Sequence, residues 1–370
     1  MKKRTLFNTI LAVLLLPGTA TCDQSNRKAQ KAAEKIGLTV TARYETTPVP
    51  QPVGKDAADD PAIWIHPEDP GQSRIIGTDK KGGLAVYNLQ GKQLFYYTDG
   101  NMNNVDVRPG FVLGTDTLDL VVASNRSTQS LSLYRIRKDG SLSNCAARLL
   151  TSQMIDKVYG ICLYTSPVSG NFYVFVNSKR GEVEQWELFA TDSLIDARLV
   201  RSLKLETQVE GMVADDRHQT LFVGQEVAGI WKFNAEPDGG QQAVLLEKCS
   251  MNDNEQIRYD IEGLALYLLP GGEGYLVASS QGNYSYAVYE RKSPHTYLGS
   301  FRITGGKIDG AEETDGLDIY SYGLNEDFAH GLLVVQDGFN VDGEQAFPQN
   351  FKLVAWEDIA ALFEPALKMN

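Results

Sequence analysis

Acidic residues recur beside glycine in this 370-residue sequence, each time at the start of a hydrophobic segment. The clearest examples are VEGMVADD (209–216), DIEGLALY (260–267) and TDGLDIYS (314–321). A single acid–glycine pair is typical of a turn. If the fold gathers Glu210, Asp260 and Glu262, however, their charges repel, so either some stay protonated or cations bind among them. Oxygen ligands without His or Cys favour a hard cation, Ca²⁺ before Mg²⁺.

Basic residues recur at a second position, directly after the next hydrophobic segment. Lys80 and Lys81 follow RIIGTD, Arg126 follows LVVASN, and Lys179 with Arg180 follow FVNS. Most such residues in any protein are solvated surface charges. Three successive occurrences at one kind of turn favour anion binding instead. Together with bound cations they would attract a substrate that carries several phosphates.

The sequence contains no recognisable side-chain nucleophile to accompany these charges. None of its four cysteines begins a C-x5-R phosphate loop, and its four histidines are scattered. The motifs HExxH, GxxxxGK[ST] and GxSxG are absent. A hydrolase of phosphate esters built on this sequence would therefore use metal-activated water.

A repeat of about fifty residues connects the acidic and the basic positions. The equivalent openings are anchored by Asp60, Asp106, Gly160, Gly211, Gly263 and Gly316. Successive anchors lie 46, 54, 51, 52 and 53 residues apart. Each unit continues with a strand, a polar turn and an aromatic-ended strand, which is a β signal. The repeat predicts an all-β, six-bladed β-propeller over residues 37–370, closed by part of LTVTARYE (38–45).

The topology of a propeller blade predicts that the acidic openings and the basic turns share one mouth. The first strand of a blade lines the central channel and the second strand runs back antiparallel, so the start of one lies beside the end of the other. The openings bring Asp56, Asp59, Asp60, Asn103, Asn104, Asp106, Tyr159, Glu210, Asp260, Glu262 and Asp315. The turns bring the five basic residues and, in the later blades, Glu226, Gln281 and Asp337.

The N-terminus is typical of an export signal, predicted over residues 1–22. A basic start, Met1 to Arg4, precedes an apolar core at 6–16 that is too short to span a bilayer comfortably. No transmembrane helix is therefore expected. Cys22 resembles a lipoprotein cysteine, but Thr19-Ala20-Thr21 departs from the usual pattern, which leaves lipidation and simple cleavage open. Either way, an extracellular or periplasmic location follows.

The remaining features are less specific. Residues 23–36 are polar and predict a tether or a short helix outside the core. Cys145, Cys162 and Cys249 form no CxxC pair and are expected to be packed thiols. The formal net charge of −12 argues against a nucleic-acid partner. No oligomer interface is recognisable, so a monomer is expected.

The sequence resembles the β-propeller phytases, the calcium-dependent alkaline phytases of bacteria. The resemblance covers residues 45–360 and includes DAADDPAIW (56–64), TDKKGGLAVY (78–87), EGMVADD (210–216), DIEGLALY (260–267) and ASSQGNYSYAVYER (278–291), in that order. It implies a 3-phytase type of activity, the stepwise hydrolysis of phytate. It also implies that phytate binds as its calcium complex and that calcium-activated water attacks phosphorus in line.

The resemblance also implies roles for individual residues. It assigns calcium ligation to Asp59, Glu210, Glu226, Asp260, Glu262 and Asp315. Phosphate contacts fall on Lys80, Lys81, Arg126, Tyr159, Lys179 and, by its turn position, Arg180. Tyr159, Lys179, Arg126 and Glu210 are expected to act in catalysis, and Asp309, Asp337 and Asn340 to hold structural calcium.

Two segments depart from the family pattern, GQEVAGIW (224–231) and TGGKIDGAEETDG (304–316), which contains Lys307. Both lead us to expect weaker calcium binding. Two other functions would account for part of this pattern. A six-bladed calcium lactonase would use one central metal but has no use for three successive basic turns. A non-catalytic propeller would tolerate the loss of Lys179 or Glu210, whereas both residues are present here.

Overall fold

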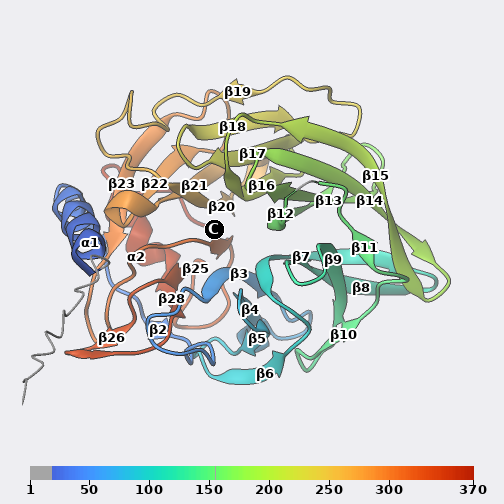
Figure 1. Cartoon of the computed structure of the whole chain (residues 1–370), viewed down its shortest axis with the longest axis horizontal. Coiled ribbons are helices and arrows are strands. Elements are labelled where there is room, and N and C mark those ends of the chain that lie inside the picture. Colours follow the sequence, from blue (N-terminus) through green and yellow to red (C-terminus); the bar gives the residue numbers. More distant parts are fainter. Residues whose placement is uncertain (1–18, 155) are drawn as a thin grey trace, which may run out of the picture.

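The computed structural model describes residues 19–154 and 156–370. Residues 1–18 of the predicted export signal lie outside the described residues. Helix α1 (Thr19–Ala33) comes first, and the strands that follow form blades around a central axis (Figure 1). Among the described residues, no helix is long and apolar enough to cross a membrane.

The six-bladed β-propeller predicted from the repeat is confirmed. The first three blades consist of β3–β6 (Ala58–Trp64, Arg74–Asp79, Gly83–Tyr87, Gln93–Tyr97), β7–β11 (Met102–Leu113, Asp116–Asn125, Ser130–Ile136, Leu142–Asn144, Leu150–Thr151) and β12–β15 (Val158–Thr165, Phe172–Ser178, Glu182–Thr191, Leu194–Lys204). Blades four and five contain β16–β19 (Val209–Asp215, Thr220–Gln225, Gly229–Asn234, Val244–Leu245) and β20–β23 (Ile261–Leu268, Gly274–Ser280, Ser285–Glu290, Tyr297–Ile303). Blade six contains β24 (Leu317–Tyr320), β25 (Leu332–Asp337) and β28 (Asn350–Ala355), with the hairpin β26–β27 (Val341–Asp342, Gln345–Ala346) inserted before β28.

The innermost strands of the blades form a closed ring around the axis. In chain order β3, β7, β12, β16, β20 and β24 each contact the next, and β24 contacts β3 again. Because the neighbouring strand within each blade is antiparallel, the start of every innermost strand lies beside the end of the second strand. This arrangement confirms the prediction that the acidic openings and the basic turns lie at the same end of the channel.

Closure of the ring uses two N-terminal strands. Strand β2 (Tyr44–Glu45) pairs antiparallel with β28 and completes blade six, as predicted. Strand β1 (Leu38–Val40) pairs parallel with β23 and adds a fifth strand to blade five, which was not foreseen. Residues 23–36 are mostly helical, and the end of this segment is packed, since Ala33 and Ile36 are buried.

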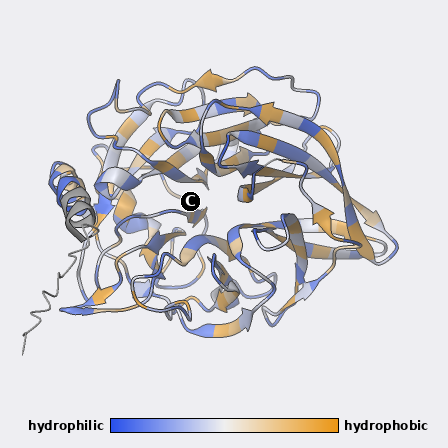
Figure 2. Ribbon diagram, viewed as in Figure 1, coloured by the Kyte–Doolittle hydropathy of each residue, from blue (hydrophilic) through white to orange (hydrophobic). Residues whose placement is uncertain are grey.

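The hydrophobic core lies between adjacent blades. Hydrophobic residues recur along the strands of every blade (Figure 2). One cluster joins Trp64 and Val86 of blade one to Val121 and Tyr134 of blade two, and similar clusters fill other blade interfaces. Both faces of each sheet are therefore covered. The three thiols expected to be packed, those of Cys145, Cys162 and Cys249, are buried and unpaired.

Candidate active site

A β-bulge at the start of the innermost strand positions the site in the first five blades. Ala58 pairs with Asp79, but the next pair joins Pro61 to Gly77, so one strand gains a residue. The same shift occurs at the corresponding place in β7, β12, β16 and β20. Bulges re-aim side chains and often border active sites. The bulged residues are Asp59-Asp60, Asn103-Asn104, Tyr159-Gly160, Glu210-Gly211 and Glu262-Gly263.

The glycine of the acid–glycine repeat allows neighbouring bulges to approach one another. A Cβ atom on Gly160 would lie 1.8 Å from the backbone oxygen of Glu210, and one on Gly211 would lie 2.1 Å from that of Glu262. In blade six the Asp315-Gly316 pair precedes β24, and the Gly316 amide donates to the backbone oxygen of Asp59 at 3.0 Å. The repeated glycine is therefore required by close packing at the axis rather than by a turn.

Small polar side chains from the second strands hold the bulged backbone in place. Thr78 Oγ1 donates to the backbone oxygen of Asn103 at 2.7 Å, and Asn177 Nδ2 donates to the backbone oxygen of Glu210 at the same distance. Ser124 Oγ donates in the same way to the Tyr159 oxygen. These residues were missed by the sequence analysis. Their signal was their position, since each stands two residues before a basic turn residue.

Glu210, Glu226 and Glu262 form a buried cluster, here called the glutamate trio. Each offers a carboxylate oxygen, and these three atoms lie within 4.8 Å of one another. Within the described residues, Glu226 Oε1 and Glu262 Oε2 are buried without a hydrogen-bond partner. Burial and the Glu210 charge raise the pKa of Glu226 to about 7, and the same causes raise the pKa of Glu262 well above its ordinary value. Such a set of crowded, orphaned oxygens fits a hard divalent cation.

Asp260 lies beside the glutamate trio and is half-buried. Burial raises the pKa of its carboxyl, and the Glu210 charge adds to that effect. The structure thus brings together four of the six predicted calcium ligands, on blades four and five.

The other two predicted ligands surround a lysine. Lys80 Nζ lies 2.9 Å from Asp59 Oδ2, 2.7 Å from Asp315 Oδ2 and 2.5 Å from Asp56 Oδ1. We call these three acids the aspartate trio. Asp59 is fully buried, and burial raises its pKa well above the ordinary value although Lys80 lowers it. Lys80, expected to contact phosphate, therefore sits among carboxylates in this structure.

Tyr159, Lys179 and Arg126 form the cationic side of the mouth. Lys179 Nζ lies 4.1 Å from the centre of the Tyr159 ring, and the Arg126 guanidinium carbon lies 5.9 Å from it. Lys179 is exposed, whereas Tyr159 is buried. Burial raises the pKa of the Tyr159 hydroxyl far above its usual range, and the charges of Glu210 and Asp59 add to this effect, so the hydroxyl stays protonated.

Asn103 connects the cationic side to the glutamate trio, and its importance was not foreseen. Its Oδ1 accepts from Arg126 Nη1 at 2.9 Å, while its Nδ2 donates to Glu210 Oε1 at 2.8 Å and to Asn104 Oδ1 at 2.7 Å. The residue has no exposed surface. A side chain so enclosed fixes the Arg126 guanidinium relative to the Glu210 carboxylate.

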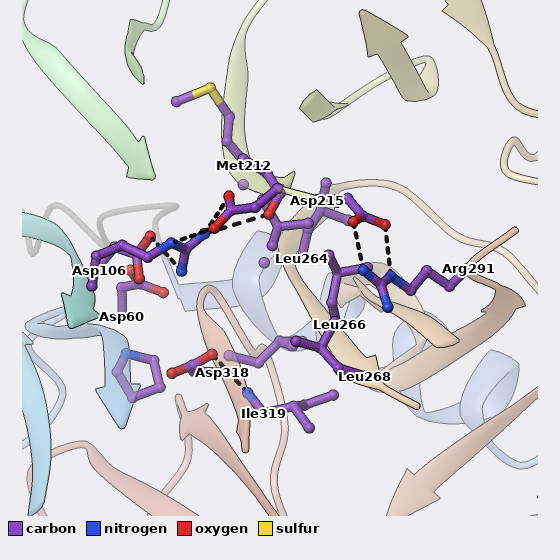
Figure 3. A pocket seen from close by; sticks show the side chains of 18 of the residues that line it. Asp60, Asp106, Met212, Asp215, Leu264, Leu266, Leu268, Arg291, Asp318 and Ile319 are labelled. Carbon is purple, nitrogen blue, oxygen red and sulfur yellow. Dashed lines mark hydrogen bonds and ion pairs between the residues drawn. The ribbon is translucent and has the colours of Figure 1, made fainter. Parts of the chain in front are cut away.

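Other predicted site residues lie at the rim or elsewhere. Lys81 is exposed one residue beyond Lys80. Arg180 is exposed, and its Nε lies 3.7 Å from Asp156 Oδ2. Asp60 and Asp106, expected at the mouth, line a pocket together with Asp318 (Figure 3). Their carboxylates accept hydrogen bonds from the neighbouring blade, as Asp60 Oδ2 does from the Val105 amide at 3.0 Å.

Asp309 and Asp337, the predicted structural calcium ligands, also meet around a lysine. The fully buried Lys352 pairs with Asp309, and its Nζ lies 3.3 Å from Asp337 Oδ2 and 2.5 Å from Glu45 Oε2. Burial raises the pKa of Asp337 to about 7 despite that lysine. Asn340 Nδ2 donates to the Pro348 oxygen at 2.7 Å. The calcium role of these three residues stays a prediction.

Taken together, the six-bladed ring and its mouth define a class of protein: a propeller that sets crowded carboxylates beside fixed cations. This combination suits hydrolysis of a polyanionic phosphate ester. The family model described as Phytase matches residues 3–370. The 3-phytase of Bacillus subtilis (strain 168) is 44% identical over 363 residues, which cover 96% of this chain and 93% of that protein. The chain belongs to the phytase family and is a hydrolase.

The solved structures that resemble this chain include the β-propeller domain of Myceliophteria thermophila Cps50 (Swd1). It has a TM-score of 0.44 and 12% sequence identity, with 80% of this chain and 82% of that chain covered. A likeness of this size carries no argument about the site.

Proposed function

We propose that the chain is a calcium-dependent phosphomonoesterase of the 3-phytase type, which hydrolyses phytate stepwise to lower inositol phosphates and phosphate. The observation that carries the proposal is the glutamate trio, whose three oxygens lie within 4.8 Å of one another on the side of the mouth next to Tyr159. The name of the Bacillus subtilis relative, a 3-phytase, supports the choice of substrate.

The residues of the trio would hold calcium, with Asp260 beside them. When bound, calcium ions would neutralise these carboxylates and lower the pKa of a water molecule. Side chains of the protein itself would bind the phosphate groups of the substrate. Lys179 and Arg126 present positive charge to phosphate oxygens, and the protonated Tyr159 hydroxyl can donate to one.

Asn103 supports phosphate binding because its hydrogen bonds hold Arg126 at a fixed place beside Glu210. A phosphate bound by Arg126 and Lys179 would therefore lie next to the glutamate trio. Positioning of this kind supplies much of the catalysis in phosphoryl transfer, where the protein has little covalent chemistry to do.

The test is phosphate release from phytate during a calcium titration of the chelator-treated protein. We expect no release without calcium, recovery as calcium is added, and loss of recovery in Glu262→Gln. Phytate left intact at every calcium concentration would refute the substrate, and an undiminished rate in excess EDTA would refute the metal. Hydrolysis of a lactone instead would favour the alternative enzyme class.

We further propose that the protein is exported as a monomer, with a lipid attached at Cys22 or with cleavage near that residue. The N-terminal sequence supports export, and the lack of a recognisable oligomer interface in the sequence supports a monomer. Mass spectrometry of the mature protein, with Cys22→Ser as the control, distinguishes the two outcomes. A protein that keeps Met1 and stays in the cytoplasm would refute export.

A further inference from the structure

Lys80 is a buried cation at the centre of the aspartate trio. Its side chain is 7% exposed, and its ammonium reaches carboxylates of Asp56, Asp59 and Asp315 at 2.5 to 2.9 Å. The three acids come from two blades: Asp56 and Asp59 lie at the start of blade one, and Asp315 lies just before β24. Gln281 Nε2 donates to the other oxygen of Asp315 at 2.7 Å, which fixes that carboxylate toward the lysine.

The glutamate trio of the same mouth has a different environment. Among the described residues no lysine or arginine forms an ion pair with Glu210, Glu226 or Glu262, and two of their oxygens are buried without a partner. The mouth therefore holds two carboxylate clusters. One contains an ammonium of the chain itself, and the other does not.

We propose that the Lys80 ammonium is an internal counter-ion that a divalent cation must displace in order to bind the aspartate trio. An ammonium and a calcium ion seek the same carboxylate oxygens, and three acids of one small site will not hold both at close range. Lys80 stands on a flexible four-carbon stem in the turn between β4 and β5, so its ammonium can leave without a change in the strands.

The displaced ammonium then becomes available to a phosphate of the substrate at the mouth. This part rests on the proposed function. It reconciles the family's phosphate role for Lys80 with its place among carboxylates in this structure. The glutamate trio would accept its ion without any displacement, so calcium would bind in two classes, and only one of them would depend on Lys80.

The first experiment measures calcium binding without substrate, by calorimetric titration of the chelator-treated protein. We expect Lys80→Met to tighten one class of site by roughly 5- to 150-fold, the range typical of coupled sites, and to leave the other class unchanged. Lys81→Met is the matched control, because it removes the same charge one residue later from an exposed side chain. Unchanged or weakened binding in Lys80→Met, or equal tightening in Lys81→Met, would overturn the proposal.

The second experiment uses the unmodified chain and so does not depend on the folding of a variant. An amine-reactive reagent is applied with and without calcium, and labelling of each lysine is read by mass spectrometry. We expect Lys80 to be protected without calcium and labelled with it, while Lys81 is labelled in both states. Protection of Lys80 that calcium does not change would overturn the displacement.

Neither experiment contains phytate, so the proposal and the proposed function can fail separately. Inorganic phosphate is the probe for the last step. With calcium in excess, phosphate should bind Lys80→Met more weakly than it binds the unmodified chain. Displacement without that difference would refute the release of Lys80 toward phosphate and leave the counter-ion role in place.

Discussion

Replacement of Asn103 tests whether the two halves of the mouth work as a unit. Asn103→Leu keeps a similar volume but removes the donor to Glu210 and the acceptor for Arg126, which lie at 2.8 and 2.9 Å. A hydrogen bond to a charged group contributes about 1.5–3 kcal/mol. Arg126 is half-buried, so water can replace its lost partner, whereas Glu210 is 2% exposed and keeps an unpaired oxygen. With the whole of the Glu210 bond, about 2 kcal/mol, counted as lost from the transition state, kcat/KM is expected to fall roughly 30-fold.

Asn103→Asp separates the two contacts. Its carboxylate still accepts from Arg126 but replaces the donor to Glu210 by a like charge. The assay is phytate hydrolysis at saturating calcium, together with inhibition by inorganic phosphate, and thermal melting checks folding. We expect both variants to lose turnover, and Asn103→Asp to lose more phosphate affinity than Asn103→Leu, because its carboxylate neutralises Arg126. A folded Asn103→Leu with the wild-type kcat/KM, or identical phosphate affinities in the two variants, would refute the reasoning.

Three further predictions concern stability. Burial and the Glu210 charge raise the pKa of Glu226 from 4.5 to about 7, so between these pH values the folded metal-free protein binds more protons than the unfolded chain. Its stability in EDTA should therefore fall as the pH rises through that interval. Glu226→Gln should flatten this fall in thermal melts, and an equal fall in the variant would contradict the assignment. Arg291 donates to both oxygens of the buried Asp215 at 2.6 Å, so Asp215→Asn should cost about 3–5 kcal/mol in denaturant unfolding, and a cost near zero would mean that the pair is dispensable. Gly211→Ala should lower both the melting temperature and the calcium affinity, since its Cβ would lie 2.1 Å from the backbone oxygen of Glu262. A variant with unchanged calcium binding would show that the neighbouring bulges can accommodate a methyl group.

The sequence predicted the fold because a propeller repeats one local pattern. Every blade needs one strand that lines the central channel and a second that runs back antiparallel beside it, and the spacing of Gly160, Gly211 and Gly263 shows that repeat directly. The shared mouth then followed from topology alone. The added strand Leu38–Val40 was not predictable in this way, because its pairing with Phe301–Ile303 joins residues far apart in the chain and is repeated in none of the other blades that the structure describes.

The site was predicted less completely, for two physical reasons. The bulge adds a residue, so strict alternation does not say which of two adjacent side chains faces the mouth. Asp59 faces Lys80, whereas Asp60 accepts from the next blade. The second reason is that a basic residue at a turn is compatible with more than one partner. Sequence position placed Lys80 correctly in space but could not show that carboxylates already surround it.

The treatment of buried acids distinguishes the active site from the rest of the molecule. Lys80 is enclosed by the aspartate trio, and the buried Lys352 pairs with Glu45, Asp309 and Asp337. Isolated buried charge is costly, and in both places the chain offsets it with an ammonium of its own. The glutamate trio has no such partner among the described residues, although its oxygens lie within 4.8 Å of one another. The fold places an ammonium of its own among the acids around Lys80 and around Lys352 but none in the glutamate trio, which lies beside Tyr159 and Lys179, and this difference locates a place where a cation from solution is needed.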